Sequence, residues 1–338
     1  MGSAVVAHYA AKGWRIIGVD NNSRQVYFGP DGDVSGQMSV NRTYEHYHHV
    51  GADIRNSWVM DNLFKKEKPD AVVHCAAQPA HEWSKLHPVE DFDINTGATV
   101  QLLDHTRTHV PDSPFVFLSS SKVYGSSINK IQLVEAAMRY DYYYIDGIDE
   151  SYPLDGSWHS PYGAHKAAAD IIVQEYGHEY GMKTVCFRPN CMTGSAHAGA
   201  TMHGFLSWLV KCAAESRTYT INGYKGKQVR DNIHAVDVAT AIGMWIDDPG
   251  VAEVFNIGGG RSAHTSICEM VHKLKSWGYP LNVQHNSEPR GADHIVYVTD
   301  TGKLEERLPE WKITYTIDDM AEEILSISAA ARTQKMEV

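Results

Sequence analysis

The chain has 338 residues and a formal net charge of −11 at pH 7, with 43% hydrophobic and 21% charged residues. This balance is typical of a soluble globular protein with one large α/β domain and a smaller lobe, or with two domains. The negative charge argues against nucleic acid and anionic membranes as partners, so an anionic substrate would need a local basic site. Five cysteines without CxxC spacing, no signal peptide and no apolar run of ~18 residues predict a cytoplasmic protein without structural zinc.

The first predicted elements are a helix over residues 4–12 and a strand over residues 14–19 that ends at Asp20. An acidic residue at the end of the second strand of a dinucleotide-binding βαβ unit accepts hydrogen bonds from the adenosine ribose and repels a 2′-phosphate. Asp20, with Asn21 beside it, is therefore predicted to bind NAD in preference to NADP, although Arg24 would offset part of that repulsion. A simple turn that begins at Asp20 is the alternative interpretation.

The beginning of the sequence lacks the Gly-rich turn of a dinucleotide-binding fold. Such a fold starts with a strand and a turn whose glycines let the backbone approach the pyrophosphate, whereas this sequence reads Met1-Gly2-Ser3 directly before the first helix. We expect the first strand, central in the sheet, to be missing, and Gly2 to keep its place at the cofactor. One hypothesis is a recorded start that is too late, with Met1 an internal residue. The alternative is a shortened protein with an exposed sheet edge and impaired cofactor binding.

Strands and helices alternate along the next hundred residues. Two short apolar runs, residues 71–77 and 115–118, read as buried strands, and helices are predicted over residues 57–67 and near 95–110. This regular alternation predicts an α/β fold with a doubly wound parallel sheet. The first run leads into a loop of small residues, which lets a cofactor lie close: Ala76, Ala77 and Gln78. The histidines that precede these elements (His46, His48 and His49) are interpreted as part of a solvated loop, and no metal site is predicted.

A Ser-rich strand end and a Tyr/Lys pair carry the chemistry. Residues 115–118 end in three serines, the second of which is Ser120, and Tyr162 and Lys166 lie four residues apart at the start of a helical segment, so both project from one face. The phenol is the acid/base, and a nearby ammonium pulls its pKa from ~10 toward neutrality. Ser120 would hydrogen bond to the substrate oxygen. YxxxK alone is a weak signal; with the Ser-rich strand end upstream, the set predicts oxidation of an alcohol with hydride transfer.

A long segment rich in Tyr and Asp separates Tyr124 from Tyr162. It is longer than an ordinary connection in a compact domain. It either covers the active site or forms a surface excursion without a role.

With these motifs the chain resembles, over nearly its whole length, the extended short-chain dehydrogenase/reductases of the nucleotide-sugar epimerase/dehydratase type. Gly2 and Ser3 match the last two residues of that family's TGGxGFxGS turn. The resemblance implies tightly bound NAD, with Asp53 and Ile54 at the adenine and Asn95 in the helix behind the active site. It also implies a homodimer that pairs the helices near 95–110 and 162–180.

The same resemblance implies two lobes. An NAD-binding Rossmann domain would span residues 1–190, with strands returning near 230–260, and residues 191–338 would form mainly the substrate lobe. Arg230 in the segment Gly-Lys-Gln-Val-Arg-Asp would pair with the substrate diphosphate, because guanidinium binds two oxygens at once. Three further residues would bind the nucleotide sugar: Asn190, Arg290 and Asp293. A surface charge is the alternative for Arg290.

The residues after Ser120 separate members of this family. The 4,6-dehydratases have T-D-E here, whereas Ser121 and Lys122 cannot supply the carboxylic acid that dehydration needs. The segments around Ser-Lys-Val-Tyr-Gly and His-Ser-Pro-Tyr-Gly are most similar to CDP-paratose (CDP-tyvelose) 2-epimerases, with departures at Ser121 and in the turn after Arg188. The implied function is C2 epimerisation of a CDP-sugar through a transient keto sugar. The alternatives are a 4-epimerase or reductase of a nucleotide sugar, and an inactive or binding-only product of a shortened gene.

Overall fold

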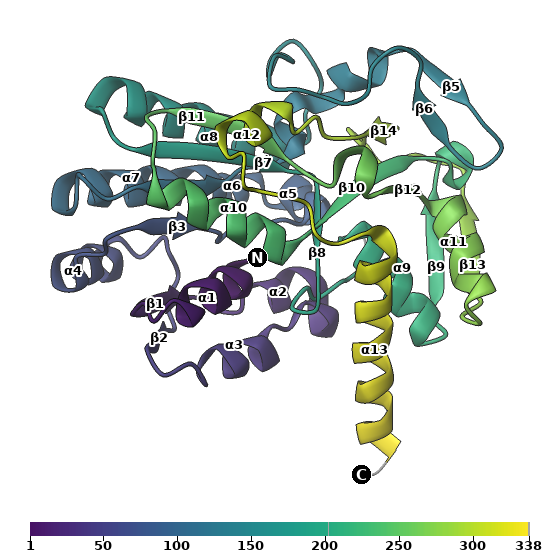
Figure 1. Ribbon diagram of the computed structural model, residues 1–338, viewed down its shortest axis with the longest axis horizontal. Coiled ribbons are helices and arrows are strands. Elements are labelled where there is room, and N and C mark those ends of the chain that lie inside the picture. The colour runs from purple at the N-terminus through teal and green to yellow at the C-terminus, as the bar shows by residue number, and fades with distance from the viewer. Residues whose placement is uncertain (202, 337–338) are drawn as a thin grey trace.

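The structure is a computed structural model that describes residues 1–201 and 203–336. Its main sheet is parallel, with the strand order β11-β7-β4-β3 (Figure 1). These strands are short and apolar, and β4 and β7 are buried along their whole length. The main-sheet strands are β3 (Val72–His74), β4 (Phe115–Leu118), β7 (Thr184–Pro189) and β11 (Glu253–Ile257).

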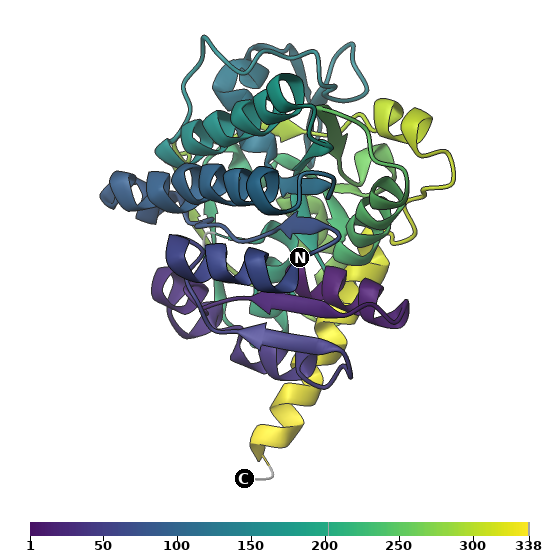
Figure 2. The same cartoon turned by 90° about the vertical axis from the view of Figure 1, so that its left-hand side faces the viewer.

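Helices cover both faces of the main sheet, as strand alternation requires. Val116 and Leu118 of β4 belong to the core that α1, α10 and α12 cover, whereas Phe115 and Phe117 belong to the core of α4, α7 and α8. The two helical layers are visible in Figure 2. The prediction of a doubly wound parallel α/β sheet is therefore confirmed. The helices are α1 (Gly2–Ala11), α4 (Ser57–Glu67), α7 (Ala98–His109), α8 (Pro161–Tyr180), α10 (Ala235–Asp247) and α12 (Gly302–Arg307).

Strands β1 (Ile16–Val19) and β2 (Tyr47–Val50) form a separate parallel pair. Among the described residues no backbone ladder joins β1 to β3, and a cavity lined by Ile17 of β1 and Val73 of β3 lies between them. No strand of the described residues fills this position in the sheet. The pair carries three short helical segments nearby, α2 (Arg24–Phe28), η1 (Gly29–Gly32) and α3 (Ser35–Asn41).

The second lobe packs α9, α11 and α13 around its own apolar core. Strands were expected to return to the main sheet near residues 230–260. Strand β11 does so, whereas β10 pairs with β8, β12 and β14 in a smaller sheet. The lobe's helices are α9 (Phe205–Ala214), α11 (Ile267–Ser276) and α13 (Ile317–Met336). Its strands are β8 (Cys191–Thr193), β9 (Thr218–Asn222), β10 (Val229–His234), β12 (His264–Ser266), β13 (Asn282–Asn286) and β14 (Val296–Tyr297), with turns η4 (Tyr224–Gly226) and η5 (Gly260–Ser262).

The Tyr- and Asp-rich segment folds against the smaller sheet. The hydroxyl of Tyr142 donates to the carbonyl of Val296 (2.9 Å), and the Ile148 amide donates to Val298 (2.8 Å). Of the residues between Val123 and Pro161, none lines the large cavity. The segment thus packs against the smaller sheet and does not cover the cavity, although one interpretation expected it to do so. It contains most of η3 (Ser121–Lys130) and the hairpin of β5 (Leu133–Glu135) and β6 (Tyr140–Tyr142).

The remaining elements connect β3 to α7 and approach the active-site helix. They are α5 (His81–Leu86), α6 (Pro88–Phe92) and η2 (Asp93–Gly97). In the part of the chain that the structure describes, no helix is long and apolar enough to cross a membrane. All five cysteines are free thiols.

Candidate active site

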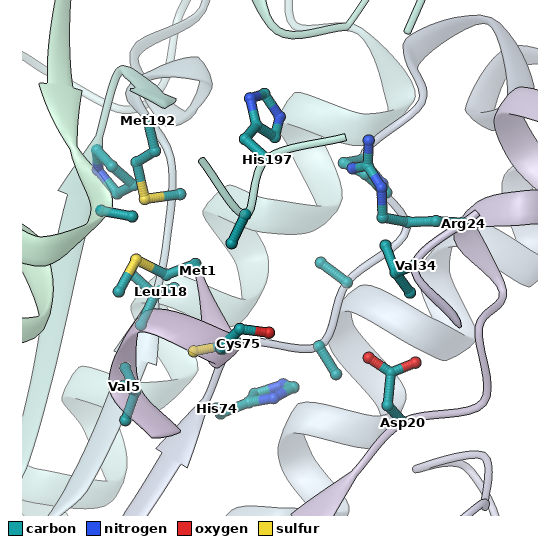
Figure 3. Close-up of a pocket in the computed structure, with 18 of the residues that line it drawn as sticks. Met1, Val5, Asp20, Arg24, Val34, His74, Cys75, Leu118, Met192 and His197 are labelled. Atoms are coloured by element: carbon teal, nitrogen blue, oxygen red, sulfur yellow. The ribbon is translucent and has the colours of Figure 1, made fainter. Parts of the chain in front are cut away.

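One cavity of about 930 Å³ runs from the β1 unit to the second lobe. A volume of this size is at the upper end of the range for ligand pockets. It extends along the gap between β1 and β3 and reaches the carboxyl ends of the main-sheet strands, where open α/β sheets bind ligands. Figure 3 shows Asp20 and Arg24 on one side of it and Met1, Cys75 and Leu118 on another.

The three predicted catalytic residues meet at this cavity. Ser120 follows directly after β4, and Tyr162 and Lys166 lie one turn apart at the start of α8; all three line the cavity. The helix begins here because Ser160 caps it, its hydroxyl accepting from the amide of Gly163 (3.2 Å), and Pro161 occupies the first turn. The Ser120 hydroxyl lies close enough to the Tyr162 hydroxyl to favour a lower pKa of the phenol. The local sequence thus fixes the position of the phenol beside the strand end.

The pKa values of Tyr162 and Lys166 differ from what the sequence suggested. Burial raises the pKa of Tyr162 to about 12, although the nearby Ser120 hydroxyl acts in the opposite direction. Burial also lowers the pKa of Lys166 to about 7. The Lys166 ammonium donates to the carbonyl of Leu118 (2.7 Å) and lies 3.9 Å from the centre of the Phe117 ring. The expectation that Lys166 pulls the pKa of Tyr162 toward neutrality is therefore wrong, because burial dominates for both groups.

The predicted cofactor residues of the β1 unit lie together at one end of the cavity. The Asp20 carboxylate accepts from the amide of Asn22 (2.7 Å), and the amide of Asn21 donates to Asp53 (3.2 Å). Arg24 donates to the carbonyl of Ala198 in the second lobe (2.6 Å), and burial lowers its pKa to about 10. Ile54, Ala76 and Ala77 complete the same wall. An acidic strand end, a carboxylate and small apolar residues along one elongated cavity fit a dinucleotide.

Three other predicted cofactor residues have different positions. Gly2 is the first residue of α1 and lines the cavity, with an added Cβ 3.8 Å from that of Cys75. Gln78 and Asn95 are buried but do not line the cavity. Instead, the Asn95 side chain bonds both the amide (3.1 Å) and the carbonyl (2.9 Å) of Gln78. That Gln78 and Asn95 contact the cofactor remains a prediction. In the structure their hydrogen bonds hold the loop that follows β3.

The predicted substrate residues lie at the opposite end. Asp293 accepts from Lys122 (2.8 Å) and from Arg230 (2.9 Å). Burial alone would raise the pKa of Asp293, but the charges of Lys122 and Arg230 outweigh it and hold this pKa well below its usual range. Asn190 donates to Asp231 (2.6 Å), and Arg290 also lines the cavity. This end is therefore a basic region within an acidic chain.

Sequence reasoning missed two residues here. His81 lines the cavity, its ring centre lies 4.8 Å from that of Tyr162, and its Nδ1 is 3.1 Å from the Ser160 hydroxyl. Burial lowers the pKa of His81 to about 3, so its ring is neutral at neutral pH. Lys122 was considered only as a residue that cannot supply an acid. The position of Lys122 between the catalytic serine and Asp293 depends on the fold and has no signal in the sequence.

Residues 1–258 match the NAD dependent epimerase/dehydratase family. The chain belongs to this family. The match spans the β1 unit, the main sheet and the three residues Ser120, Tyr162 and Lys166. NAD is accordingly the cofactor, in agreement with the sequence-based prediction.

Individual members of the epimerase/dehydratase family resemble the chain to different degrees. It is 32% identical to CDP-paratose 2-epimerase of Salmonella typhi over 90% of this chain and 89% of the relative. It is 29% identical to UDP-glucose 4-epimerase of Yersinia pestis over 80% of this chain and 78% of the relative. The solved structure of UDP-glucose 4-epimerase from Bifidobacterium longum, in complex with NAD⁺ and UDP, has a TM-score of 0.77 at 24% identity and covers 98% of this chain and 95% of that one. The structural likeness shows the fold.

The buried Lys166 makes a prediction for stability against pH. Its pKa is about 7 in the folded protein and ~10.4 in an unfolded chain. Below pH 7 both states hold the proton, and the folded state bears the cost of a buried charge. Between pH 7 and the unfolded-state pKa, only the unfolded state keeps the proton on Lys166. The free energy of unfolding therefore rises with pH in this range.

We therefore expect the urea midpoint of the wild type, relative to Lys166→Met, to be level below about pH 7 and to rise toward pH 10. Lys66→Met, which removes an exposed ammonium, is the control and should leave the wild-type profile unchanged. Parallel profiles for wild type and Lys166→Met would show that Lys166 keeps an ordinary pKa.

Proposed function

We propose that this protein is an NAD-dependent nucleotide-sugar epimerase that acts through a transient keto sugar, and that its substrate is a CDP-sugar epimerised at C2. The observation that carries the proposal is the meeting of Ser120, Tyr162 and Lys166 at the cavity that also contains the basic region. The similarity to CDP-paratose 2-epimerase supports the choice of base and carbon.

In this proposal Tyr162 takes the proton of the sugar hydroxyl, and Ser120 donates a hydrogen bond to the oxygen that becomes the ketone. When bound, NAD supplies the positively charged ring that accepts a hydride and returns it. A positive charge close to the phenol is needed, because a phenol with a pKa of about 12 keeps its proton at neutral pH. Lys166, one turn from Tyr162, is the residue of this chain that can hold such a charge near the phenolate.

The basic region supports an anionic substrate. Lys122 and Arg230 both contact Asp293, and Arg290 lines the same part of the cavity. Guanidinium and ammonium groups bind phosphate oxygens strongly when water is excluded. We propose that these residues, with Asn190, bind the nucleotide diphosphate, which would compete with Asp293 for the two cations.

Position 122 also argues for epimerisation over dehydration. Elimination of water from the sugar needs a carboxylic acid close to the catalytic serine. Here Ser121 donates to Asn190 (3.1 Å) and Lys122 is ion-paired. Neither side chain can protonate a departing hydroxide as a carboxylic acid does.

A 4-epimerase of a nucleotide sugar is the second candidate. It is supported by the 29% identity to UDP-glucose 4-epimerase of Yersinia pestis. Both reactions use the same three catalytic residues and differ in which carbon the substrate lobe presents. A reductase and a binding-only protein are further alternatives, and the experiments below separate all four.

Tyr162→Phe removes the hydroxyl that transfers the proton and is expected to lower kcat by at least ~10²–10⁴-fold. The far-UV circular dichroism spectrum should not change, because the ring that packs beside His81 is retained. Tyr143→Phe, at an exposed tyrosine, is the matched control and should keep full activity. Wild-type turnover by Tyr162→Phe would reject the mechanism.

Cofactor and substrate are tested on the purified chain. Denaturation should release close to one NAD(H) per chain, and incubation with CDP-sugars and UDP-sugars should convert the CDP-sugar with inversion at C2 and no net consumption of NADH. Inversion at C4 would establish the 4-epimerase, and stoichiometric NADH consumption would establish a reductase. A chain that binds the nucleotide sugar but releases no NAD(H) and turns nothing over would be a binding-only protein.

We also propose a homodimer through α7 and α8. A second copy packed on α8 would cover the exposed side chain of Ile171. Light scattering should give twice the chain mass for the wild type and the single mass for Ile171→Asp. Val26→Asp, at an exposed valine of α2, is the control and should remain dimeric. A monomeric wild type would contradict the proposal.

A further inference from the structure

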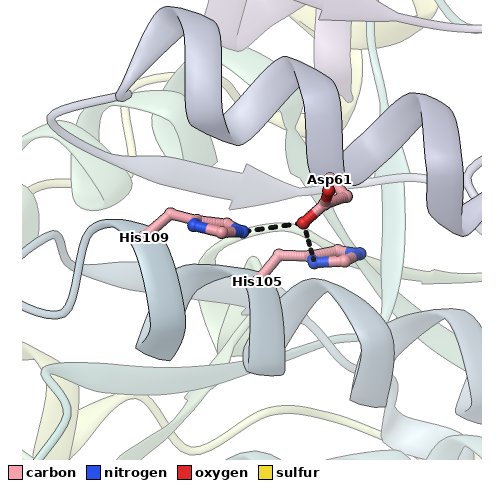
Figure 4. Close-up of side chains that lie close together, drawn as sticks. All are labelled: Asp61, His105 and His109. Atoms are coloured by element: carbon pink, nitrogen blue, oxygen red, sulfur yellow. Dashed lines mark hydrogen bonds and ion pairs between the residues drawn. The ribbon is translucent and has the colours of Figure 1, made fainter.

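A carboxylate and two imidazoles meet on the outer side of the α4–α7 pair, away from the cavity. Asp61 lies on α4, and His105 and His109 lie one turn apart on α7, so both rings project from one face. Figure 4 shows both rings directed at the same carboxylate. None of the three residues lines the large cavity.

The distances between the three side chains are those of potential metal ligands. Asp61 Oδ1 is 2.8 Å from His109 Nε2 and 3.8 Å from His105 Nδ1. The three ligand atoms all lie within 4.8 Å of one another. An ion ~2.0–2.1 Å from each of three tetrahedral ligands holds them about 3.3–3.4 Å apart. The two shorter separations lie on either side of that value, so small side-chain rotations would complete the geometry.

The surroundings orient the three groups. Lys65 bonds the second oxygen of Asp61 (2.5 Å), which leaves Oδ1 directed at the imidazoles. The outer nitrogen of His105 lies 3.4 Å from the Ser57 hydroxyl, and its ring packs against Phe64 at 5.8 Å between centres. Metal-binding histidines commonly have such a partner on the other nitrogen. The His105 and His109 rings are nearly parallel, at 15°.

From this geometry we propose that Asp61, His105 and His109 bind one divalent transition-metal ion, Zn²⁺ or an ion of similar ligand preference. Two imidazole nitrogens and one carboxylate oxygen suit Zn²⁺, Co²⁺, Ni²⁺ or Cu²⁺ and do not suit Mg²⁺ or Ca²⁺, which take oxygen ligands. Water would fill the fourth position. The side chains are 13% exposed for His105, 15% for His109 and 29% for Asp61, so an ion can enter from solvent.

The ion would link α4 to α7 and take no part in the proposed reaction. Both helices cover the same face of the main sheet, where Met60 and Phe64 of α4 share a core with Leu102 and Leu103 of α7. An ion bound to both would stabilise the folded state in proportion to its occupancy, because an unfolded chain holds no such ligand set. This inference does not depend on the proposed function.

The full chain, stripped with a chelator, would be titrated with Co²⁺ by visible absorption and with Zn²⁺ by calorimetry. We expect one ion per chain, a Co²⁺ spectrum typical of tetrahedral coordination, and a rise in melting temperature with Zn²⁺. Each of His105→Ala and His109→Ala should weaken binding by more than about tenfold, because even the outer partners of ligands contribute that much.

Two controls keep the test decisive. His272→Ala removes an exposed helical histidine elsewhere and should bind as the wild type does, which excludes binding by scattered surface histidines. Asp61→Asn keeps the shape of the side chain and should weaken binding even if a histidine variant folds poorly. The same stoichiometry and affinity in the His105→Ala/His109→Ala double variant, or no saturable binding of Zn²⁺ in the micromolar range, would overturn the proposal.

Discussion

The site depends on one buried ion pair beneath it. Asp170, one turn beyond Lys166 on α8, pairs with Arg188 of β7 at 2.7 Å, and both side chains are almost fully buried. The same carboxylate accepts from Ser119, the residue before the catalytic serine, and Arg188 donates to the Tyr124 hydroxyl (3.0 Å). Tyr124 in turn donates to Asn256 of β11 (2.7 Å). Since buried charges are costly unless paired and hydrogen bonded, this network allows few alternatives to the placement of α8 beside the end of β4.

The sequence predicted the residues of the candidate site but not their environment. Ser120, Tyr162 and Lys166 were found from a strand end and a helical spacing, because both patterns are local and their elements meet at one edge of a parallel sheet. The direction of the Lys166 ammonium depends on the Leu118 carbonyl and the Phe117 ring, which only the folded chain brings to it. The pKa values of Tyr162 and Lys166 depend on burial, and hydrophobic periodicity does not measure burial at a single polar atom.

The end of the cavity that contains the predicted cofactor residues was also only partly predictable from the sequence. Asp20 and Asp53 both line the cavity, the first expected there from its position at a strand end and the second from the family resemblance. That wall belongs to the β1–β2 pair, which no backbone ladder among the described residues joins to β3. Its position is set by packing, with Tyr9 of α1 in one core with Trp245 of α10. The geometry of this end of the cavity therefore depends on side-chain contacts rather than on strand pairing, and no sequence pattern indicated which side chains make those contacts.

The substrate end determines which reaction this arrangement can perform. In the proposed mechanism an acid/base and a serine at the reacting oxygen would serve any reaction through a keto sugar, so these residues cannot separate the reactions. The neighbouring side chains can: Lys122 gives the site a cation, held by Asp293, where dehydration would need a carboxylic acid. A ketone formed beside Lys122 has no acid at hand to expel its neighbouring hydroxyl. In the proposed reaction the hydride then returns to the opposite face of this ketone, so these side chains favour epimerisation over dehydration.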